Sequence, residues 1–312
     1  MIGEAVHDPR GHVRNGSAAT RCRRAQQDLA KLLSQYVAWA DPTKSRIVPD
    51  DTKMESMTDP QSIALSKVPE VTLGFWIIKI FATTLGEVGG NAVTMQLGFG
   101  YLIGSAIFAA VLVVLVGAQI MAKRFLPFLY WAVIVATTLT GTALADFFDR
   151  SLGIGYLGGS LFLFSMVIAT IGLWYWMLGS VSVQTVASPK VEVFYWTTIM
   201  FSQTLGTALG DWMADTGLGY NDSALVILLV LGVVALLYYF TGVSRTLLFW
   251  AAFILTRPLG ATIANSFDKP IGQGGLAVSD LKASAVLAVL IVISIILIPQ
   301  RAGRHVGDTA SP

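Results

Sequence analysis

The chain has 312 residues, of which 54% are hydrophobic and only 13% are charged, and its mean hydropathy is +0.66. Soluble domains carry about 25% charged residues, so this composition indicates an integral membrane protein. The formal net charge of +2 is too small to indicate a nucleic-acid partner. Cys22 is the only cysteine, so a disulfide within the chain is excluded and the redox compartment stays undetermined.

Residues 1–67 differ from the rest in charge. They hold ten of the 21 Lys/Arg and eight of the 19 Asp/Glu, so eleven of each remain for the longer part of the chain. We expect a cytoplasmic, largely flexible extension in which residues 24–39 form an amphipathic peripheral helix. No apolar stretch of signal-peptide length precedes residue 68, so the first span is expected to direct insertion. Residues 1–53 precede Met54 and Met57, and whether they belong to the native protein is open.

The remaining sequence contains eight apolar windows, each close to the ~20 residues that a helix needs to cross a bilayer. The windows are 73–92, 99–121, 126–146, 156–178, 193–212, 222–242, 246–265 and 282–299. We therefore expect an all-α membrane protein with eight transmembrane helices in residues 68–300 and a tail at 301–312. Most basic residues outside the spans follow even-numbered spans, which places both termini in the cytoplasm. These residues are Lys123, Arg124, Lys190, Arg245, Arg301 and Arg304.

Four tryptophans reveal an internal repeat. Trp76, Trp131, Trp196 and Trp250 begin the odd-numbered spans, at the expected cytoplasmic interface where indole is common. Equal spacings from each of them reach the same kinds of residue, which is the signature of a repeat. Ten residues on are Gly86, Gly141, Gly206 and Gly260; fourteen on are Gly90, Ala145, Gly210 and Ala264; fifteen on are Asn91, Asp146, Asp211 and Asn265. Four tandem two-helix repeats in a pseudo-symmetric arrangement are thus expected at about 68–122, 123–185, 186–243 and 244–300.

Through these four tryptophan-to-Asp/Asn units the chain resembles a family of bacterial integral membrane proteins, built of four tandem two-span repeats with a characteristic tryptophan and described as a repeat of unknown function. The resemblance covers residues 68–300. It implies the architecture and a multi-pass location in the bacterial inner membrane. It implies no catalytic or binding residues.

The small residues at the tenth and fourteenth positions are four apart, so each pair forms a small-xxx-small stripe along which helices can approach closely. Asp146 and Asp211 follow the stripe by one residue, about 100° around the helix, at the edge of that contact face. A charge at the bilayer centre costs at least ~2.5–3.5 kcal/mol, so these carboxylates should face protein, water or an ion. Because the odd spans run in one direction, we expect Asn91, Asp146, Asp211 and Asn265 to converge at one depth around a shared axis.

Further polar residues extend this expected site inward. Glu87 lies one turn deeper than Asn91, with Thr142 and Thr207 at the matching positions of the next two repeats. The supporting polar residues are Thr83, Thr84, Thr138, Gln203 and Thr204. Carboxylates, amides and hydroxyls suit hard cations such as Mg²⁺, Ca²⁺ and Mn²⁺, and the hypothetical metal ligands are Glu87, Asp146 and Asp211. Copper or a His/Cys zinc site is not expected, because His7, His12 and His305 lie outside the spans.

Two cations also lie within the expected spans. Lys79 and Arg257 against Glu87, Asp146 and Asp211 leave a net charge of −1, which a bound cation would reduce. Arg257 either pairs with Glu87 or an aspartate of another repeat until a substrate competes, or serves only as a structural tether. Pro258 is expected to bend the seventh helix, as a fixed feature or as a gate.

The aspartates and the GxGY segments also have interpretations that involve no transport function. Asp146 and Asp211 could cap helix ends or bond the following GxGY turn, and the GxGY segments are typical of tight turns or tyrosine anchors rather than of a selectivity filter. Five further aspartates are expected to be solvated near an outer mouth, where they would attract cations. These are Asp149, Asp215, Asp222, Asp268 and Asp280.

The leading hypothesis is a membrane transporter or channel for a small hard cation, with divalent metal export, manganese first, as the best guess. The alternative is a membrane scaffold or sensor whose polar residues only pack the repeats. A membrane enzyme ranks third, since no nucleophile-base set is evident. We expect no enzyme activity, no cofactor and no nucleic-acid partner; the lipid bilayer is the expected partner, and homo-oligomerisation is left open.

Overall fold

The computed structural model describes residues 67–181, 186, 188–273 and 275–303. The chain divides into two units, Met1–Ile63 and Ala64–Pro312, and everything below concerns the second. The expectations for residues 24–39, His7, His12, His305 and most of the two cytoplasmic ends lie outside the described residues.

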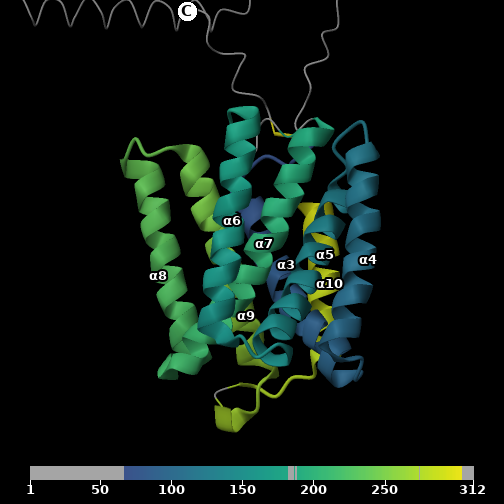
Figure 1. The fold of residues 1–312 in the computed structure, drawn as a ribbon, viewed down its shortest axis with the longest axis vertical. Helices are drawn as coiled ribbons and strands as arrows, with labels where there is room; N and C mark the ends of the chain where they lie inside the picture. The colour runs from purple at the N-terminus through teal and green to yellow at the C-terminus, as the bar shows by residue number, and fades with distance from the viewer. Residues whose placement is uncertain (1–66, 182–185, 187, 274, 304–312) are drawn as a thin grey trace, which may run out of the picture. The chain divides into compact units, whose positions relative to one another are not determined.

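Eight α-helices occupy the described residues at the eight apolar windows. They are α3 (Leu73–Asn91), α4 (Gly100–Met121), α5 (Pro127–Asp146), α6 (Gly155–Leu178), α7 (Pro189–Met213), α8 (Gly219–Phe240), α9 (Arg245–Asp268) and α10 (Asp280–Leu297). Across the described residues the only strand-like pairing is the isolated bridge between Pro69 and Ala302. The all-α prediction and the two-helix repeat are therefore confirmed (Figure 1).

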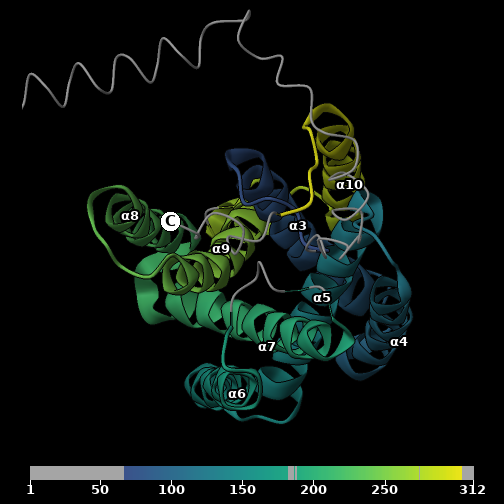
Figure 2. The ribbon, with the colours of Figure 1, turned by 90° about the horizontal axis from the view of Figure 1, so that it is seen from above.

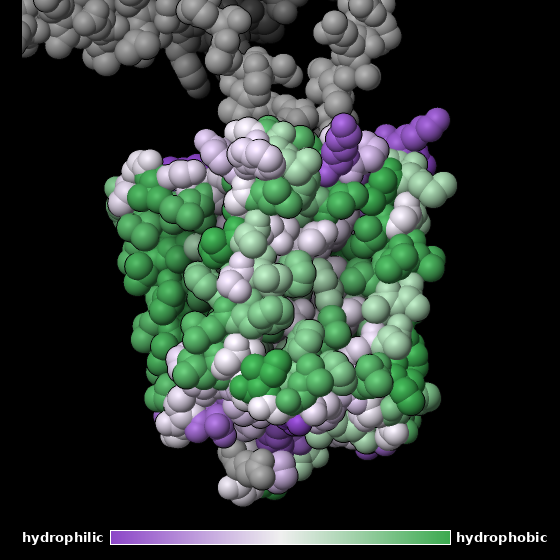
Figure 3. Space-filling model, in the orientation of Figure 1, coloured by the Kyte–Doolittle hydropathy of each residue, from purple (hydrophilic) through white to green (hydrophobic). Residues whose placement is uncertain are grey.

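Six helical segments of the described residues are long and apolar enough to cross a membrane, with α7 and α8 joined in one of them. Helix α3, which carries Lys79 and Glu87, is not among the six. On the face shown in Figure 3, apolar side chains form a broad band and hydrophilic residues gather at the two ends. This distribution is that of a multi-pass membrane protein, because the band can face lipid while the ends face water.

The first helix of each repeat belongs to an inner ring, which closes on itself. Helix α3 packs against α5, α5 against α7, α7 against α9, and α9 returns to α3 (Figure 2). The second helix of each repeat lies outside and packs on the inner helix of the next repeat, so α4 covers α5, α6 covers α7, α8 covers α9 and α10 covers α3. The four repeats are thus arranged cyclically, as the tandem spacing predicts.

Short π-helical turns end the first three inner helices, at η1 (Ala92–Gln96), η2 (Phe147–Ser151) and η4 (Ala214–Leu218). Each is followed by a tight turn with two glycines at positive φ, such as Gly98 and Gly100, both at 74°. Only glycine adopts this conformation without strain, which explains the GxG pattern and favours the turn interpretation of these segments. The fourth repeat lacks this turn: α9 ends at Asp268 and is followed by the short helix η5 (Ile271–Gln273), in line with its degenerate sequence.

The other end of the inner ring is filled by an aromatic collar, in which the residue before each tryptophan contacts the tryptophan of the next repeat. The pairs are Phe75–Trp131, Tyr130–Trp196, Tyr195–Trp250 and Phe249–Trp76, with ring centroids 5.4, 5.6, 6.1 and 5.9 Å apart. Trp131, Trp196 and Trp250 are each at most 4% exposed. These rings therefore join the repeats, and their position at a membrane interface stays a prediction.

Candidate functional site

Close backbone approach between the inner helices forms the frame of the site. The glycine ten residues after each tryptophan contacts the residue seven after the tryptophan of the next repeat. The contacts are Gly86 with Thr138, Gly141 with Gln203, Gly206 with Arg257 and Gly260 with Thr83. A Cβ on Gly141 would lie 3.0 Å from the backbone of Gln203 and Thr204, so no larger residue fits without movement. The predicted small-residue stripes are thus helix contacts, and they close the ring.

Inside this frame the structure pairs Arg257 of α9 with Glu87 of α3. Arg257 Nη2 lies 3.1 Å from Glu87 Oε2, and Arg257 Nη1 donates to the Thr83 carbonyl over 3.2 Å. Arg257 Nη2 also donates to Thr142 Oγ1 of α5. Arg257 is fully buried and Glu87 is 3% exposed, so this is a desolvated ion pair joining three inner helices. The sequence-based interpretation in which Arg257 pairs with Glu87 is confirmed.

A second group joins the two aspartates of the repeated phrase. Arg150 Nε lies 2.9 Å from Asp146 Oδ1, and Arg150 Nη2 lies 3.5 Å from Asp211 Oδ2. Asp146 and Asp211 are 3% and 9% exposed, whereas the Arg150 side chain is 37% exposed. The carboxylates neither cap helices nor bond the glycine turns; they face each other across one guanidinium group.

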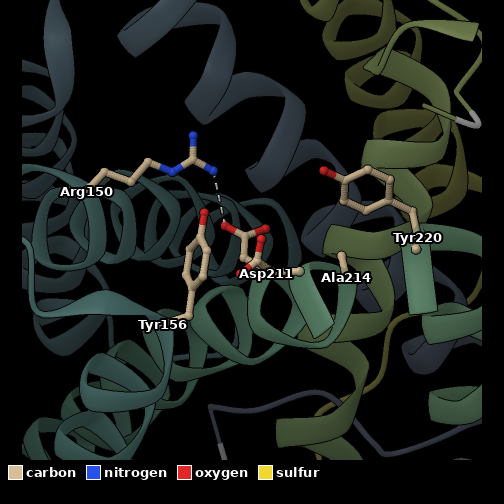
Figure 4. A pocket seen from close by; sticks show the side chains of 7 residues that line it. Arg150, Tyr156, Asp211, Ala214 and Tyr220 are labelled. Atoms are coloured by element: carbon tan, nitrogen blue, oxygen red, sulfur yellow. Dashed lines mark ion pairs between the residues drawn. The ribbon is translucent and has the colours of Figure 1, made fainter. Parts of the chain in front are cut away.

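A pocket of about 270 Å³ opens beside this group and is lined mainly by polar side chains. Figure 4 shows Arg150 paired with Asp211, with Tyr156 of α6 beside them and Tyr220 of α8 on the opposite side. Asp215 and the backbone at Gly219 complete the polar lining. The pocket therefore reaches Asp211 at the end of the inner ring opposite the aromatic collar, whereas Asp146 is not part of its lining.

The asparagines of the predicted quartet are buried at the equivalent repeat positions. Asn91 is 4% exposed at the end of α3, and Asn265 is 2% exposed in the last turn of α9. Of the four predicted residues, Asp146 and Asp211 form ion pairs with Arg150, so the structure brings these two into one charged group. Asn91 and Asn265 are neutral and take no part in these ion pairs.

Most supporting threonines are committed to backbone carbonyls. Hydroxyls of Thr84, Thr204 and Thr207 donate within their own helices, while Thr138 donates to Ala82 O and Thr142 to Gly86 O on α3. Thr83 likewise donates to carbonyls of α3 and to Thr256 O. The hydroxyls of Thr83, Thr138 and Thr142 thus link neighbouring inner helices, and the Thr142 hydroxyl also contacts the Glu87–Arg257 pair.

The sequence places Arg150 in the short loop after the third expected span and gives it no role in the site. The π-helical turn η2 keeps it in register with α5, four residues after Asp146, and so returns its side chain to the site. Adding Arg150 to the buried charges Lys79, Arg257, Glu87, Asp146 and Asp211 changes their sum from −1 to 0. Asp149 is also buried and adds one negative charge, so the sum depends on which outer groups are counted. A basic residue four positions after a buried aspartate was the sequence signal for Arg150.

Other outer aspartates also differ from expectation. Asp149 is only 7% exposed because its carboxylate lies against Gly159 of α6, and Asp268 pairs with Lys269 at 3.4 Å, with 6% of its side chain exposed. Asp280 is half-buried, while Asp215 and Asp222 are exposed as predicted. Burial disfavours the Lys269 ammonium, but the carboxylates of Asp268 and Glu87 outweigh it and raise the pKa of Lys269. The rim of the site is therefore partly desolvated, and Asp268 and Lys269 form an ion pair within it.

Within the described part of the chain, no three His, Cys, Asp or Glu side chains are arranged to hold a metal ion. The carboxylates hypothesised as metal ligands are divided between two arginines, Glu87 with Arg257 and the two aspartates with Arg150.

Comparison with known proteins identifies the repeat. No curated protein and no solved structure matches the chain. The family model described as Repeat of Unknown Function (DUF347) matches four times, at residues 74–125, 129–179, 194–244 and 248–299. Each match covers one inner helix and the outer helix that follows it. The chain therefore belongs to the DUF347 repeat family, with four tandem copies of the repeat.

Proposed function

We propose that the protein is a membrane transporter or channel for a small hard cation, and that Asp146 and Asp211 are the residues that bind it. The observation that carries the proposal is the position of one guanidinium between two buried carboxylates from neighbouring repeats, next to a polar pocket. Both carboxylates lie within ion-pair distance of the same guanidinium, and in this proposal one small cation takes its place. Carboxylate oxygens are suitable ligands for such a cation.

In this proposal Arg150 acts as an internal competitor. Its side chain is 37% exposed at the pocket and its Nη1 donates to Tyr101 Oη over 3.3 Å, so it has a polar surface on which to rest when displaced. While Arg150 occupies the aspartates, it reduces their summed charge from −2 to −1, so the site costs less to keep in the membrane. A divalent cation that enters from the pocket would neutralise both aspartates as Arg150 leaves.

We further propose that all eight helices span a bacterial inner membrane, with the aromatic collar toward the cytoplasm. Lys123, Arg124, Lys190 and Arg245 precede α5, α7 and α9, at the end of the unit where the collar lies. Excess Lys and Arg in short loops is typical of the cytoplasmic side. The pocket would then open outward, and manganese export is the first specific transport activity to assay.

The test is ion flux into proteoliposomes that contain the purified full chain and a metal-sensitive dye, assayed with Mn²⁺, Mg²⁺ and Ca²⁺. We expect wild-type flux of at least one cation, and Asp211→Asn or Asp146→Asn should lower it by at least about tenfold because each removes a charged ligand. Asp222→Asn, at an exposed position of α8, is the matched control and should retain full flux. Arg150→Gln should tighten cation binding, because the competitor is gone.

A membrane scaffold without transport activity is the alternative, and one observation favours it. Glu87, Asp146 and Asp211 each lie within ion-pair distance of an arginine, so the chain itself supplies a partner for each carboxylate without a bound ion. A scaffold requires no wild-type flux for any cation at any tested gradient. That result, with correctly folded protein in the vesicles, would overturn the transport proposal.

A further inference from the structure

A second buried polar group lies on the inner helices, on the collar side of Glu87. It shares Arg257 with the Glu87–Arg257 pair. Lys79 of α3, Gln203 of α7 and Arg257 of α9 are all 0% exposed. Lys79 Nζ donates to Gln203 Oε1 over 3.4 Å and lies 4.0 Å from the centre of the Phe253 ring. Arg257 is near enough to repel Lys79 electrostatically. We call Lys79, Gln203 and Arg257 the donor cluster.

The donor cluster has more N–H groups than acceptors. Gln203 Nε2 and Arg257 Nε have no hydrogen-bond acceptor among the described residues, and the Lys79 ammonium has one long hydrogen bond and one aromatic ring for its three N–H groups. A buried donor without an acceptor costs about 1–3 kcal/mol, and native proteins rarely leave one. Three such side chains in one place indicate an acceptor that the described chain does not supply.

The same cluster has an excess of positive charge. Within the described residues, Arg257 is paired with Glu87, whereas no Asp or Glu forms an ion pair with Lys79. Two fully buried cations therefore share one carboxylate. Because an uncompensated charge away from water is costly, the missing component is both an acceptor and a single negative charge.

We propose that the donor cluster binds a small monovalent anion of the size of chloride. The anion would accept from Lys79 Nζ, Gln203 Nε2 and Arg257 Nε, and so bind α3, α7 and α9 together near the centre of the ring. A water molecule could accept hydrogen bonds there but would leave the charge of Lys79 uncompensated. The site is separate from the Asp146–Arg150–Asp211 group and holds whether or not the protein transports cations.

The test compares the thermal unfolding midpoint of the purified full chain in detergent, in sodium chloride and in sodium gluconate of equal ionic strength. A ligand that binds only the folded state raises the midpoint, by roughly 5 °C when it is about 100-fold above its dissociation constant. We expect chloride to stabilise the wild type and the larger gluconate not to do so. Equal midpoints in the two salts over the whole concentration range would overturn the proposal.

Variants locate the effect. Lys79→Met removes the unpaired charge, so the chloride-dependent rise should disappear, while Lys282→Met on the exposed surface of α10 should keep it. Gln203→Leu retains Lys79 but removes one donor, and should require several-fold more chloride for the same rise. A full rise in either Lys79→Met or Gln203→Leu contradicts the assignment, so the idea stays testable if one variant does not fold. Because the measurement needs no flux, it is decided independently of the transport proposal.

Discussion

The two ends of the inner ring are built from the same repeat but differ in how closely their side chains follow it. At the collar end, all four repeats supply an aromatic pair of the same geometry, Phe75–Trp131 being followed around the ring by three equivalents. At the pocket end, the equivalent positions hold two asparagines and two aspartates, and only the second repeat supplies an arginine, Arg150, that pairs with both aspartates. The collar keeps the fourfold pattern, and the pocket breaks it.

This difference separates residues that close the ring from residues that give it a chemical character. Glycines, tryptophans and their aromatic neighbours recur because every inner-helix contact needs the same close approach. Glu87, Arg150, Lys79 and Arg257 each occur in a single repeat at their positions, and all take part in polar contacts of the interior or the pocket. Departures from the repeat are therefore the best guide to function in this chain.

The largest effect is expected where both ends depend on the same contact. Gly141→Leu places a side chain against the backbone of Gln203 and Thr204, where even a Cβ would lie at 3.0 Å, and backbone cannot move aside without separating α5 from α7. Overpacking costs about 1–3 kcal/mol where side chains can adjust. Here the backbones of two inner helices must separate, so we expect a larger loss than in any variant below and little folded protein after detergent extraction. The readout is the monodisperse fraction in size-exclusion chromatography.

Gly117→Leu on the outer helix α4 is the matched control, because no atom lies within 4 Å of a Cβ there. It should give a wild-type yield. Equal yields for Gly141→Leu and Gly117→Leu would contradict the closed ring of inner helices.

An intermediate effect is expected at the Glu87–Arg257 ion pair. Glu87→Gln leaves the fully buried Arg257 without its carboxylate, and losing one partner of a buried pair typically costs about 3–5 kcal/mol. We expect the thermal midpoint in detergent to fall by roughly 10 °C or more. Glu70→Gln, at an exposed position outside the helices, should leave the midpoint unchanged.

The double variant Glu87→Gln with Arg257→Met shows whether Arg257 stabilises the fold through contacts of its own or only requires a carboxylate to balance its charge. It removes the unpaired cation, so the midpoint should recover most of the loss seen in the single variant. If the double variant is less stable than Glu87→Gln alone, Arg257 contributes through contacts other than the ion pair, such as those to Thr83 and Thr142.

The repeat made much of the fold predictable from the sequence. Four tryptophans with constant spacing to glycine gave the helices, their pairing into repeats and the small-residue contacts, because each depends on local pattern. The ion-pair partners of the buried charges could not be predicted from local pattern. Glu87 and Arg257 are 170 residues apart, and their pairing follows only from closure of the ring. Arg150 was missed because a π-helical turn, which apolar periodicity does not reveal, returns it to the site.

The smallest effect is expected in the collar, where the repeats themselves offer the replacement. Tyr130 and Tyr195 are fully buried and share a hydrogen bond of 2.8 Å between their hydroxyls, whereas the first and fourth repeats have Phe75 and Phe249 at this position. Tyr130→Phe leaves the Tyr195 hydroxyl buried without its partner, so we expect a loss of about 1–3 kcal/mol in the free energy of unfolding. Tyr195→Phe should cost a similar amount. The double Phe variant makes the collar alike in all four repeats and should be close to wild type in thermal midpoint, because both polar groups are removed together. Additive losses in the double variant would mean that each hydroxyl has a further hydrogen-bond partner. The collar would then be stabilised by polar contacts as well as by aromatic packing.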